Sequence, residues 1–299
     1  MRLSAFVAFA MKYIRFIACL ALIGCQQPAQ TQRFEAAISV GEIKDNEIRE
    51  ASGLVASVNN PGMLWTHNDS GNNAAIFLMD AQGEITGTVH LTGITNRDWE
   101  DIAVGAGPEA GKSYIYIGEI GDNNAVYDTK ILYRLEEPRL ESGVTDTTLT
   151  KIDKIEFKLS DGKRDSEALL IDPVSTDFYI FSKRESRINM YKLSGPLQPG
   201  EILTAERVLE GLPFTLIVAA DVSEDGSEIL VKSYDNIFYW KRMPGESIED
   251  AIKRTPETLP YSPEPQGESI AFSRKGDGYY TISERKKKTT QHLYFYKRK

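Results

Sequence analysis

Three glutamates stand in similar surroundings, each directly before a short apolar run. They are Glu100 in DWEDIAV, Glu167 in DSEALLI and Glu268 in GESIAFS. A core strand normally begins after a turn residue, so a carboxylate repeated at this position indicates a shared chemical task. Carboxylates that meet at reduced dielectric repel one another, and either their protonation shifts or a cation neutralises them. With oxygen ligands and no His or Cys beside them, the preferred cation is Ca²⁺.

The segments that carry these glutamates are predicted to be strands. From Phe34 onward the hydrophobic pattern has a period of two, in short aromatic and β-branched runs such as SYIYIGEI, DFYIFSKR and HLYFYKR. Gly, Asp, Asn or Pro bounds each run, which is typical of strands joined by turns. Only residues 245–254 have the pattern of a short helix. The chain is therefore expected to be all-β.

The beginnings of the strand groups recur at a spacing that predicts a β-propeller. Aligned strand heads are separated by 48, 67, 53 and 48 residues, and about three further strand candidates follow each head. Repeats of this length are typical of propeller blades. We expect a five-bladed β-propeller, with six blades as the alternative. The last repeat ends after HLYFYKR, so residues 36–43 are expected to supply its outer strand and close the ring.

In such a ring the innermost strand of every blade points its head at the central channel, so the heads would meet around one axis. The fourth head departs from the pattern, because Ala220 stands at the aligned position and Asp221 follows it. The alternative is that the glutamates only accept hydrogen bonds from backbone N–H groups of tight turns. The predicted ligands of an axial Ca²⁺ are Ser52, Glu100, Glu167, Asp221 and Glu268.

Loops that follow the second strand of each blade should share the face of the strand heads. Two of these loops, HNDSGN and IGDNN, contain Asn and Asp side chains. Asp69 and Asp122 are candidates to orient a nucleophile, and Asn68 and Asn123 are candidates to bind a ligand. Tight hairpins also favour Asn and Asp, so a role in turns stays open for all four.

A third loop, SKRES, contains the adjacent cations Lys183 and Arg184. Turn chemistry does not require two neighbouring cations. Beside an anionic centre they could hold a phosphate or a carboxylate, because both side chains form charge-assisted hydrogen bonds with such groups. The alternative is a solvated or ion-paired loop.

The first residues predict export. Residues 1–24 combine a basic start, an apolar stretch and a small-residue cleavage site, which is typical of a secretory signal. The ending Leu22-Ile23-Gly24-Cys25 resembles the bacterial lipobox, in which cleavage leaves Cys25 as an acylated N-terminus. An ordinary secretory signal is the alternative. Residues 25–33 would then form a lipidated polar tether, and residues 34–299 the propeller domain.

Charge argues against nucleic acid as a partner. Arg2, Lys12 and Arg15 would leave with the signal, which takes the formal net charge from −8 to −11. Binding to nucleic acid rests on neutralising phosphates, so it is not expected here. The two glutamines after Cys25 lack the acid that retains some lipoproteins at the inner membrane. This favours anchoring at the outer membrane.

An ordered set of motifs covers nearly all of residues 50–285. It comprises SGLVAS, RDWEDIAVG, YIYIGEIGDN, DSEALLIDP, FYIFSKRE, AADVSEDG and QGESIAF. The set resembles a family of exported bacterial β-propeller proteins of unestablished activity. More distantly, the chain resembles the calcium-activated nucleotidases (apyrases) and the esterase-like phytase propellers. The apyrase resemblance implies an axial Ca²⁺ at Ser52, Glu100, Glu167 and Glu268, and a basic loop, FSKRES, that handles phosphate.

Two functions fit these features. The first is a lipid-anchored module of the bacterial envelope, in which Ca²⁺ stiffens the ring. The face that contains the strand heads would then bind a small anionic ligand or an envelope partner. The second is a Ca²⁺-dependent phosphoester or phosphoanhydride hydrolase, with Lys183 and Arg184 stabilising the developing charge. The lack of an unmistakable catalytic base favours the binding module. We expect the protein to be a monomer.

Overall fold

The computed structural model describes residues 32–140, 146–286 and 289–299. They form 21 strands and one short helix, α1 (Ile248–Lys253), so the predicted all-β class is confirmed. The helix lies within residues 245–254, where the sequence predicted it. Among the described residues, no helix has the length and apolar character needed to span a membrane. The signal, Cys25 and most of the tether lie outside the described residues.

The strands form four sheets. The first contains β2 (Ala51–Ala56), β3 (Leu64–Asn68), β4 (Ala75–Met79), β5 (Ile85–Leu91) and β9 (Asp146–Leu149). The second contains β6 (Trp99–Ala106), β7 (Ser113–Glu119), β8 (Lys130–Glu136), β10 (Asp153–Leu159), β14 (Leu203–Leu212), β13 (Ile188–Leu193), β12 (Phe178–Ser182) and β11 (Ser166–Ile171). The third contains β15 (Ile217–Val222), β16 (Glu228–Ser233), β17 (Ile237–Lys241) and β18 (Glu257–Leu259). The fourth contains β19 (Ser269–Phe272), β20 (Gly278–Ile282), β21 (His292–Lys297) and β1 (Ile38–Glu42).

The eight-stranded sheet consists of two antiparallel units that are joined at their outer strands, because β10 and β14 pair in parallel. We therefore describe the strands as five quartets, each named by its innermost strand. They are the β2 quartet (β2–β5), the β6 quartet (β6, β7, β8, β10), the β11 quartet (β11–β14), the β15 quartet (β15–β18) and the β19 quartet (β19–β21 and β1). The remaining strand, β9, extends the β2 quartet by pairing in parallel with β5.

The β19 quartet contains strands from both ends of the described chain. β1 pairs antiparallel with β21, and Ile38 lies opposite Phe295. Phe34 forms a further bridge with Arg298 just outside these strands. The prediction that residues 36–43 supply the outer strand after HLYFYKR is therefore confirmed.

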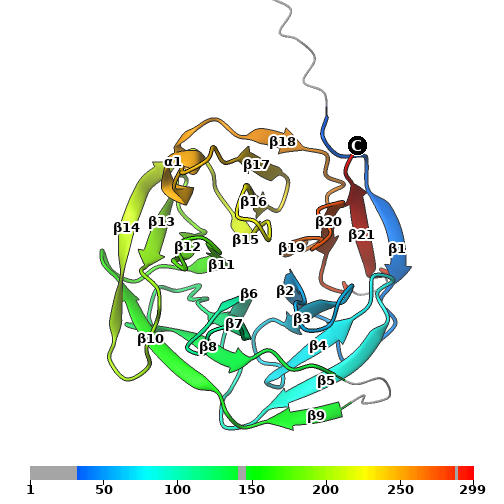
Figure 1. The fold of residues 1–299 in the computed structure, drawn as a ribbon, viewed down its shortest axis with the longest axis horizontal. Helices are drawn as coiled ribbons and strands as arrows, with labels where there is room; N and C mark the ends of the chain where they lie inside the picture. Colours follow the sequence, from blue (N-terminus) through cyan, green and yellow to red (C-terminus); the bar gives the residue numbers. More distant parts are fainter. Residues whose placement is uncertain (1–31, 141–145, 287–288) are drawn as a thin grey trace, which may run out of the picture. The chain divides into compact units, whose positions relative to one another are not determined.

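The innermost strands lie around a common centre, which we call the hub (Figure 1). Each of them contacts the next in cyclic order: β2 with β6, β6 with β11, β11 with β15, β15 with β19, and β19 with β2. Both faces of β2 and β11 are buried, because each strand packs against a quartet on either side. This explains why the strand heads precede continuous apolar runs rather than alternating ones.

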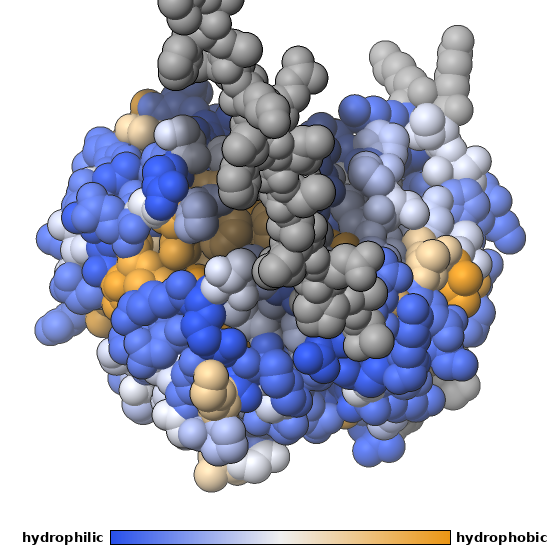
Figure 2. Space-filling view, turned by 90° about the horizontal axis from the view of Figure 1, so that it is seen from above, coloured by the Kyte–Doolittle hydropathy of each residue, from blue (hydrophilic) through white to orange (hydrophobic). Residues whose placement is uncertain are grey.

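Apolar side chains fill the spaces between neighbouring quartets. One cluster joins the β11 and β15 quartets through Leu170, Ile217 and Trp240, and another places Trp65 and Trp99 between the β2 and β6 quartets. Trp99 is thus a core residue. Hydrophilic residues cover most of the surface seen in Figure 2, and hydrophobic residues reach it in separate patches. Burial between quartets is therefore the main source of stability.

Two aspartates satisfy the free edges of the innermost strands. Each innermost strand pairs on one side only, which leaves backbone N–H groups directed at the hub. The Asp101 carboxylate accepts hydrogen bonds from the N–H groups of Leu169 in β11, at 2.9 Å, and Ala220 in β15, at 3.2 Å. Asp221 accepts one from the N–H group of Phe272 in β19, at 2.7 Å. These contacts tie four of the five innermost strands together.

The β2 strand is joined to the hub by a serine. The Ser52 hydroxyl donates to the backbone carbonyl of Glu100 in β6, at 2.6 Å. Ser52 also forms a parallel bridge with Glu268, the residue before β19. The cycle of contacts around the hub is thereby completed by hydrogen bonds to β2.

Asp101→Ala should lower the free energy of unfolding by about 2–3 kcal/mol, because it leaves buried N–H groups of β11 and β15 without an acceptor. Asp101→Asn keeps one acceptor oxygen and should cost less. Asp277→Ala removes an exposed aspartate and is the control. Urea unfolding followed by circular dichroism would measure all three variants. Equal stability of the Asp101→Ala and Asp277→Ala proteins would contradict the role assigned to Asp101.

Candidate metal centre

A β-bulge interrupts each of the first four innermost strands near its beginning. The register with the second strand shifts at Gly53 in β2, Glu100 in β6, Glu167 in β11 and Val218 in β15. A bulge bends the strand and re-aims the side chain of the extra residue. In β6 and β11 the extra residue is one of the repeated glutamates, so the bulges position their carboxylates.

The bulges also correct the alignment of strand heads made from the sequence. The residue equivalent to Glu100 is Gly53 rather than Ser52, and Val218 rather than Ala220. Gly53 has φ +74°, and a Cβ there would collide with the His67 ring, so the β2 quartet has no side chain at this position. The chain thus lacks a head acid in two quartets.

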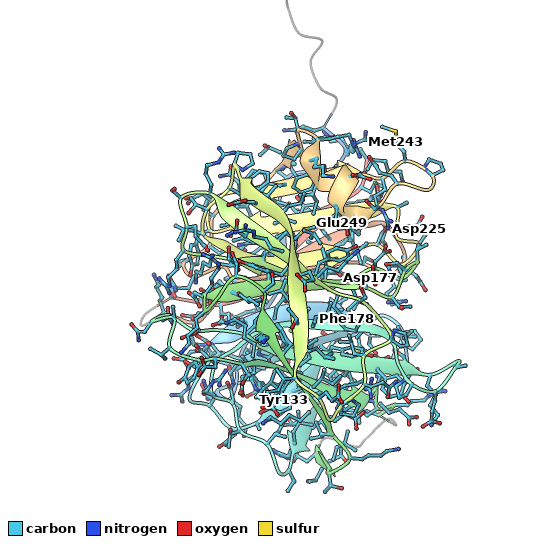
Figure 3. All side chains as sticks on the ribbon, turned by 90° about the vertical axis from the view of Figure 1, so that its left-hand side faces the viewer. Tyr133, Asp177, Phe178, Asp225, Met243 and Glu249 are labelled. Atoms are coloured by element: carbon cyan, nitrogen blue, oxygen red, sulfur yellow. The ribbon has the colours of Figure 1, made fainter. Side chains whose placement is uncertain are left out.

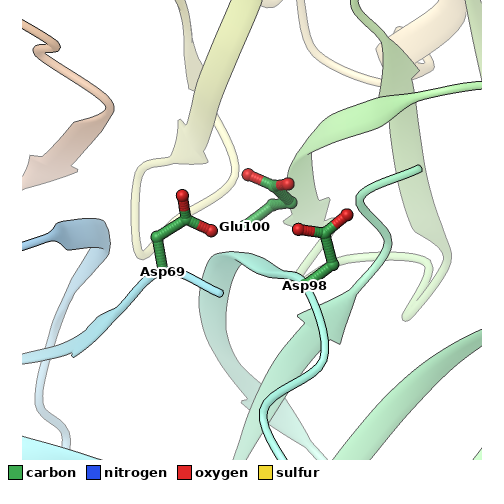
Figure 4. A group of neighbouring side chains, drawn as sticks. All are labelled: Asp69, Asp98 and Glu100. Carbon is green, nitrogen blue, oxygen red and sulfur yellow. The ribbon is translucent and has the colours of Figure 1, made fainter. Parts of the chain in front are cut away.

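Seven carboxylates from four quartets converge at the end of the hub where the innermost strands begin, which we call the acidic end. They form three groups in which one oxygen of each residue lies within 4.8 Å of the others. Asp69 and Glu100 each belong to two groups, so the groups are continuous. In Figure 4 the carboxylates of Asp69, Asp98 and Glu100 are directed toward one another. The groups are Asp69–Asp98–Glu100, Asp69–Glu268–Glu284 and Glu100–Asp165–Glu167.

Antiparallel pairing explains why these residues meet. The first strand of a quartet begins beside the end of its second strand. Asp69 therefore follows β3, and Lys183, Tyr234 and Glu284 follow β12, β16 and β20 closely. The acidic end thus combines the heads of innermost strands with the loops after second strands, as the sequence predicted.

Burial and mutual repulsion make ionisation of Glu100, Asp69 and Glu284 unfavourable. Glu100 and Glu167 are 4% and 3% exposed. Burial, reinforced by the charge of Glu167, raises the pKa of Glu100 well above its ordinary value. Burial and the charges of Glu268 and Asp98 raise the pKa of Asp69 to about 6. Burial and the charges of Glu268 and Asp69 raise the pKa of Glu284 to about 8.

Gly121, which follows β7, forms one wall of the acidic end. A Cβ at this position would overlap Oε1 of Glu100 and the carboxylate of Asp98. Glycine is therefore required here for close approach of backbone to carboxylate, and not for a left-handed conformation. Its small size keeps the Asp69–Asp98–Glu100 group together.

Lys183 is an internal cation for one part of the acidic end. It is buried, and its Nζ donates to Oε2 of Glu167 and to the Tyr234 hydroxyl, at 3.0 Å. The same Nζ lies 3.9 Å from Oε1 of Glu268, which accepts a hydrogen bond from Tyr234. Although burial lowers it, the charge of Glu167 raises the pKa of Lys183 above its ordinary value. Lys183 therefore remains an ammonium group and neutralises this side of the site.

The Asp69–Asp98–Glu100 group has no such partner. Among the described residues, no lysine or arginine forms an ion pair with any of the three. Buried acidic groups of this kind could bind a metal ion. The charge of the buried Lys130 acts against the raised pKa of Asp98, but its Nζ donates to the Ile120 carbonyl and forms no ion pair with the triad. The triad is therefore the part of the acidic end that could bind an added cation.

Two of the predicted site residues are bonded to the backbone. Ser52 donates to the carbonyl of Glu100, as described above. The Asn68 side chain accepts from the N–H groups of Arg49 and Glu50, at 3.0 and 3.1 Å. Both therefore shape the acidic end rather than offering free ligand atoms to it.

The loop after β7 and the basic loop after β12 are also held by hydrogen bonds and ion pairs. Asp122 accepts from the N–H groups of Val126 and Tyr127, at 2.8 and 3.0 Å, and so fixes the loop that contains it. Arg184 Nε lies 2.6 Å from Oδ2 of Asp165, at the edge of the acidic end. Unlike Lys183, Arg184 is half exposed.

Two further predicted residues do not join the acids. Asn123 is exposed in the loop after Asp122. Asp221 belongs to none of the three carboxylate groups, and it lines a cavity formed by the later residues of the innermost strands. Asp221 follows the bulge at Val218 by three residues, whereas Glu100 and Glu167 are themselves bulge residues. Asp221 therefore lies further along its strand than the two glutamates do.

Four residues of the acidic end were not predicted: Asp98, Asp165, Tyr234 and Glu284. A signal for the first two exists in the sequence, because Arg-Asp-x-Glu occurs at both 97–100 and 164–167. The other two follow serines at 233 and 283, just as Lys183 follows Ser182. Comparing the loops after the second strands with one another would have found them.

A second groove differs from the acidic end in its charge balance. It has a volume of about 600 Å³ and lies where Figure 3 labels Asp177, Asp225, Met243 and Glu249. Its charged side chains are largely paired within the protein. Lys192 lies 2.9 Å from Glu249 and 3.6 Å from Asp177, for example. This groove is therefore stabilised by its own ion pairs and does not require an added ion.

No family model matches the chain, and no curated protein matches it in sequence. Among solved structures, a luciferin-regenerating enzyme is similar, with a TM-score of 0.46 and 11% sequence identity. The similar region covers 88% of this chain and 95% of that one.

Without divalent cations, the free energy of unfolding should fall as the pH rises from about 5 to about 8. Asp69 and Glu284 have ordinary pKa values of 3.8 and 4.5, whereas their folded-state values are about 6 and about 8. Between these limits the folded state binds more protons than the unfolded state, so stability is lost as pH rises. Urea unfolding in EDTA at several pH values would measure this.

The double variant Asp69→Asn, Glu284→Gln is the control for this pH dependence. It removes both titrations and should make the curve shallower over the same pH range, while other buried acids such as Glu100 keep their raised pKa values. A wild-type protein that becomes more stable between about pH 5 and about pH 8 would show that the acidic end is not strained by its own charge.

Proposed function

We propose that the protein is a five-bladed β-propeller whose acidic end binds Ca²⁺, and that the loaded site serves as a ligand- or partner-binding module. The observation that carries this proposal is the triad of the buried Glu100 and the partly buried Asp69 and Asp98, which has no ion-paired lysine or arginine among the described residues. A buried group of like charges is stable only when a cation or bound protons neutralise it.

Support for five blades comes from the pairing of strands. The described strands divide into five quartets, and their innermost strands contact one another in a single cycle. Five clusters of buried apolar residues lie at the junctions between neighbouring quartets. Five blades with five interfaces account for these features. The parallel pairing of β10 with β14 is then a link between two blades.

The chemistry of the triad favours Ca²⁺ over softer metals. Its ligand atoms are carboxylate oxygens, which suit Ca²⁺ and Mg²⁺, whereas zinc and copper sites usually include nitrogen or sulfur ligands. His67 belongs to none of the three groups, and Nδ1 of its buried ring is bonded to the Asn68 carbonyl oxygen. The ligands come from separate quartets, and Ca²⁺ tolerates such irregular geometry better than Mg²⁺ does.

The cations beside the triad support binding of an anionic ligand. Arg184 is half exposed beside Asp165, and Lys183 lies between Glu167 and Glu268. A bound Ca²⁺ would present positive charge to solvent at the triad, and an anion held there could also contact Arg184. We further propose that Cys25 carries a lipid anchor that places the module at the bacterial envelope.

Ca²⁺ should bind to the purified protein with about one ion per chain and raise its melting temperature by several degrees. Glu100→Gln should weaken Ca²⁺ binding by about tenfold or more, because it removes one carboxylate charge from the triad. The same variant should melt higher than wild type in EDTA, since one repelling charge is gone. Isothermal titration calorimetry and thermal melts would measure both effects.

Two further variants make this test specific. Glu206→Gln removes an exposed glutamate in β14 and should leave Ca²⁺ affinity and melting unchanged. Lys183→Met removes the internal cation and should tighten Ca²⁺ binding, because the ion no longer competes with an ammonium group. Loss of affinity in Lys183→Met, or unchanged affinity in Glu100→Gln, would count against the proposed site.

Asp69 favours a second function, the Ca²⁺-dependent hydrolysis of phosphoesters or phosphoanhydrides. It is only partly buried, it belongs to two of the carboxylate groups, and its pKa is raised to about 6 by burial first of all. A general base works best when its pKa lies near the working pH. Asp69 could therefore accept a proton from a water molecule that Ca²⁺ activates.

If the protein is a hydrolase, turnover of a nucleoside diphosphate or a phosphomonoester should require Ca²⁺ and should fall at acid pH, where Asp69 becomes protonated. Because bound Ca²⁺ favours the ionised carboxylate, this fall should lie below the pKa of about 6 that Asp69 has without the metal. Asp69→Asn should abolish the turnover, because the amide cannot accept the proton. Release of phosphate would be measured with and without EDTA. Ca²⁺ binding without turnover of either substrate would leave the binding module as the function.

A further inference from the structure

The hub contains a cavity at the end opposite the acids. Its volume is about 390 Å³, which lies within the roughly 300–1,000 Å³ that is usual for ligand pockets. All five innermost strands contribute to its wall through their later residues. These include Val55, Ala103, Ile171, Val222 and Phe272. None of the residues of the three carboxylate groups lines this cavity, so the cavity and the acidic end are separate sites.

Along β6, Asp101 lies between Glu100, which belongs to the acidic end, and Ala103, which lines the cavity. Its carboxylate crosses the hub to the N–H groups of β11 and β15. It does not line the cavity. A ligand in the cavity would therefore be separated from the acidic end by hydrogen-bonded protein groups.

Asp221 is the acidic group in the wall that lacks an ion-pair partner. Burial raises its pKa to about 7, and a cation bound beside it would favour the ionised form. Its two oxygens accept from the N–H groups of Val222, at 2.8 Å, and Phe272, at 2.7 Å. Each oxygen keeps a further lone pair for another donor. Among the described residues, no lysine or arginine forms an ion pair with Asp221.

The cations around the cavity are already paired. Arg274 lies 2.9 Å from Glu224 at the rim. Lys112 lies 2.9 Å from both Glu109 and Glu136. The cavity therefore offers apolar side chains and, in Asp221, one carboxylate without an ion-pair partner. Among the described lining residues it offers no unpaired cation.

We propose that this cavity binds a small apolar molecule that carries an ammonium group. The ammonium group donates to Asp221, where the charge makes the hydrogen bond stronger than a neutral one. The apolar part contacts the side chains of the innermost strands and is thereby buried away from water. This inference is independent of the proposed function, because it uses neither the acidic end nor Ca²⁺.

Hexylammonium is the probe, and hexanoate and hexanol are its matched controls. In isothermal titration calorimetry of the purified protein in EDTA, hexylammonium should bind saturably with one site per chain. Hexanoate and hexanol should bind at least about tenfold more weakly, because neither supplies a cation to Asp221. Equal binding of hexanoate or hexanol, or no saturable binding of hexylammonium, would overturn the proposal.

Variants then locate the site. Asp221→Asn should weaken hexylammonium binding by about tenfold or more, whereas Asp277→Asn changes an exposed residue in the β19–β20 turn and should have no effect. Val104→Trp leaves Asp221 in place and fills the cavity, so it should also abolish binding, even if Asp221→Asn does not fold. Unchanged affinity in Val104→Trp would show that hexylammonium binds elsewhere.

Discussion

The innermost strand of each quartet has one backbone edge that no other strand covers, and the rest of the structure depends on how these edges are bonded. Asp101 and Asp221 accept hydrogen bonds across the hub, and Ser52 donates one from β2. These bonds hold the innermost strands close together along the hub. The head carboxylates therefore meet even though they repel one another, because the stability gained elsewhere in the hub and between quartets exceeds the cost of their repulsion.

The acidic end divides into two parts with different means of neutralisation. Lys183 neutralises the charge of Glu167 and Glu268. The Tyr234 hydroxyl accepts a hydrogen bond from Lys183 and donates one to Glu268. The triad of Asp69, Asp98 and Glu100 has raised pKa values instead. A chain under selection for stability alone would not keep one buried and two partly buried acids in that state. Sites that cost stability are typically the sites that function requires.

Much of this arrangement was predictable from the sequence, and the exceptions have physical causes. The period-two pattern identified the strands, and the unfinished last repeat identified β1. The recurring strand heads also identified Glu100, Glu167 and Glu268 as candidate site residues. A bulge inserts one residue without a local signal, however, so Ser52 and Ala220 were aligned with positions that belong to Gly53 and Val218. Asp221 was therefore not expected at the other end of the hub. Parallel pairing of β10 with β14 was equally hidden, because it joins edges that are distant in the sequence.

The pairing of β1 with β21 sets the order in which the molecule can be completed. β1 lies near the N-terminus and its partner lies among the last residues of the chain. During synthesis β1 must remain without its partner until almost the whole polypeptide has emerged, whereas the other four quartets can form from contiguous stretches as they appear. The pairing of β1 with β21 therefore cannot precede the synthesis of β21, and a chain terminated before β21 leaves β1 without this partner.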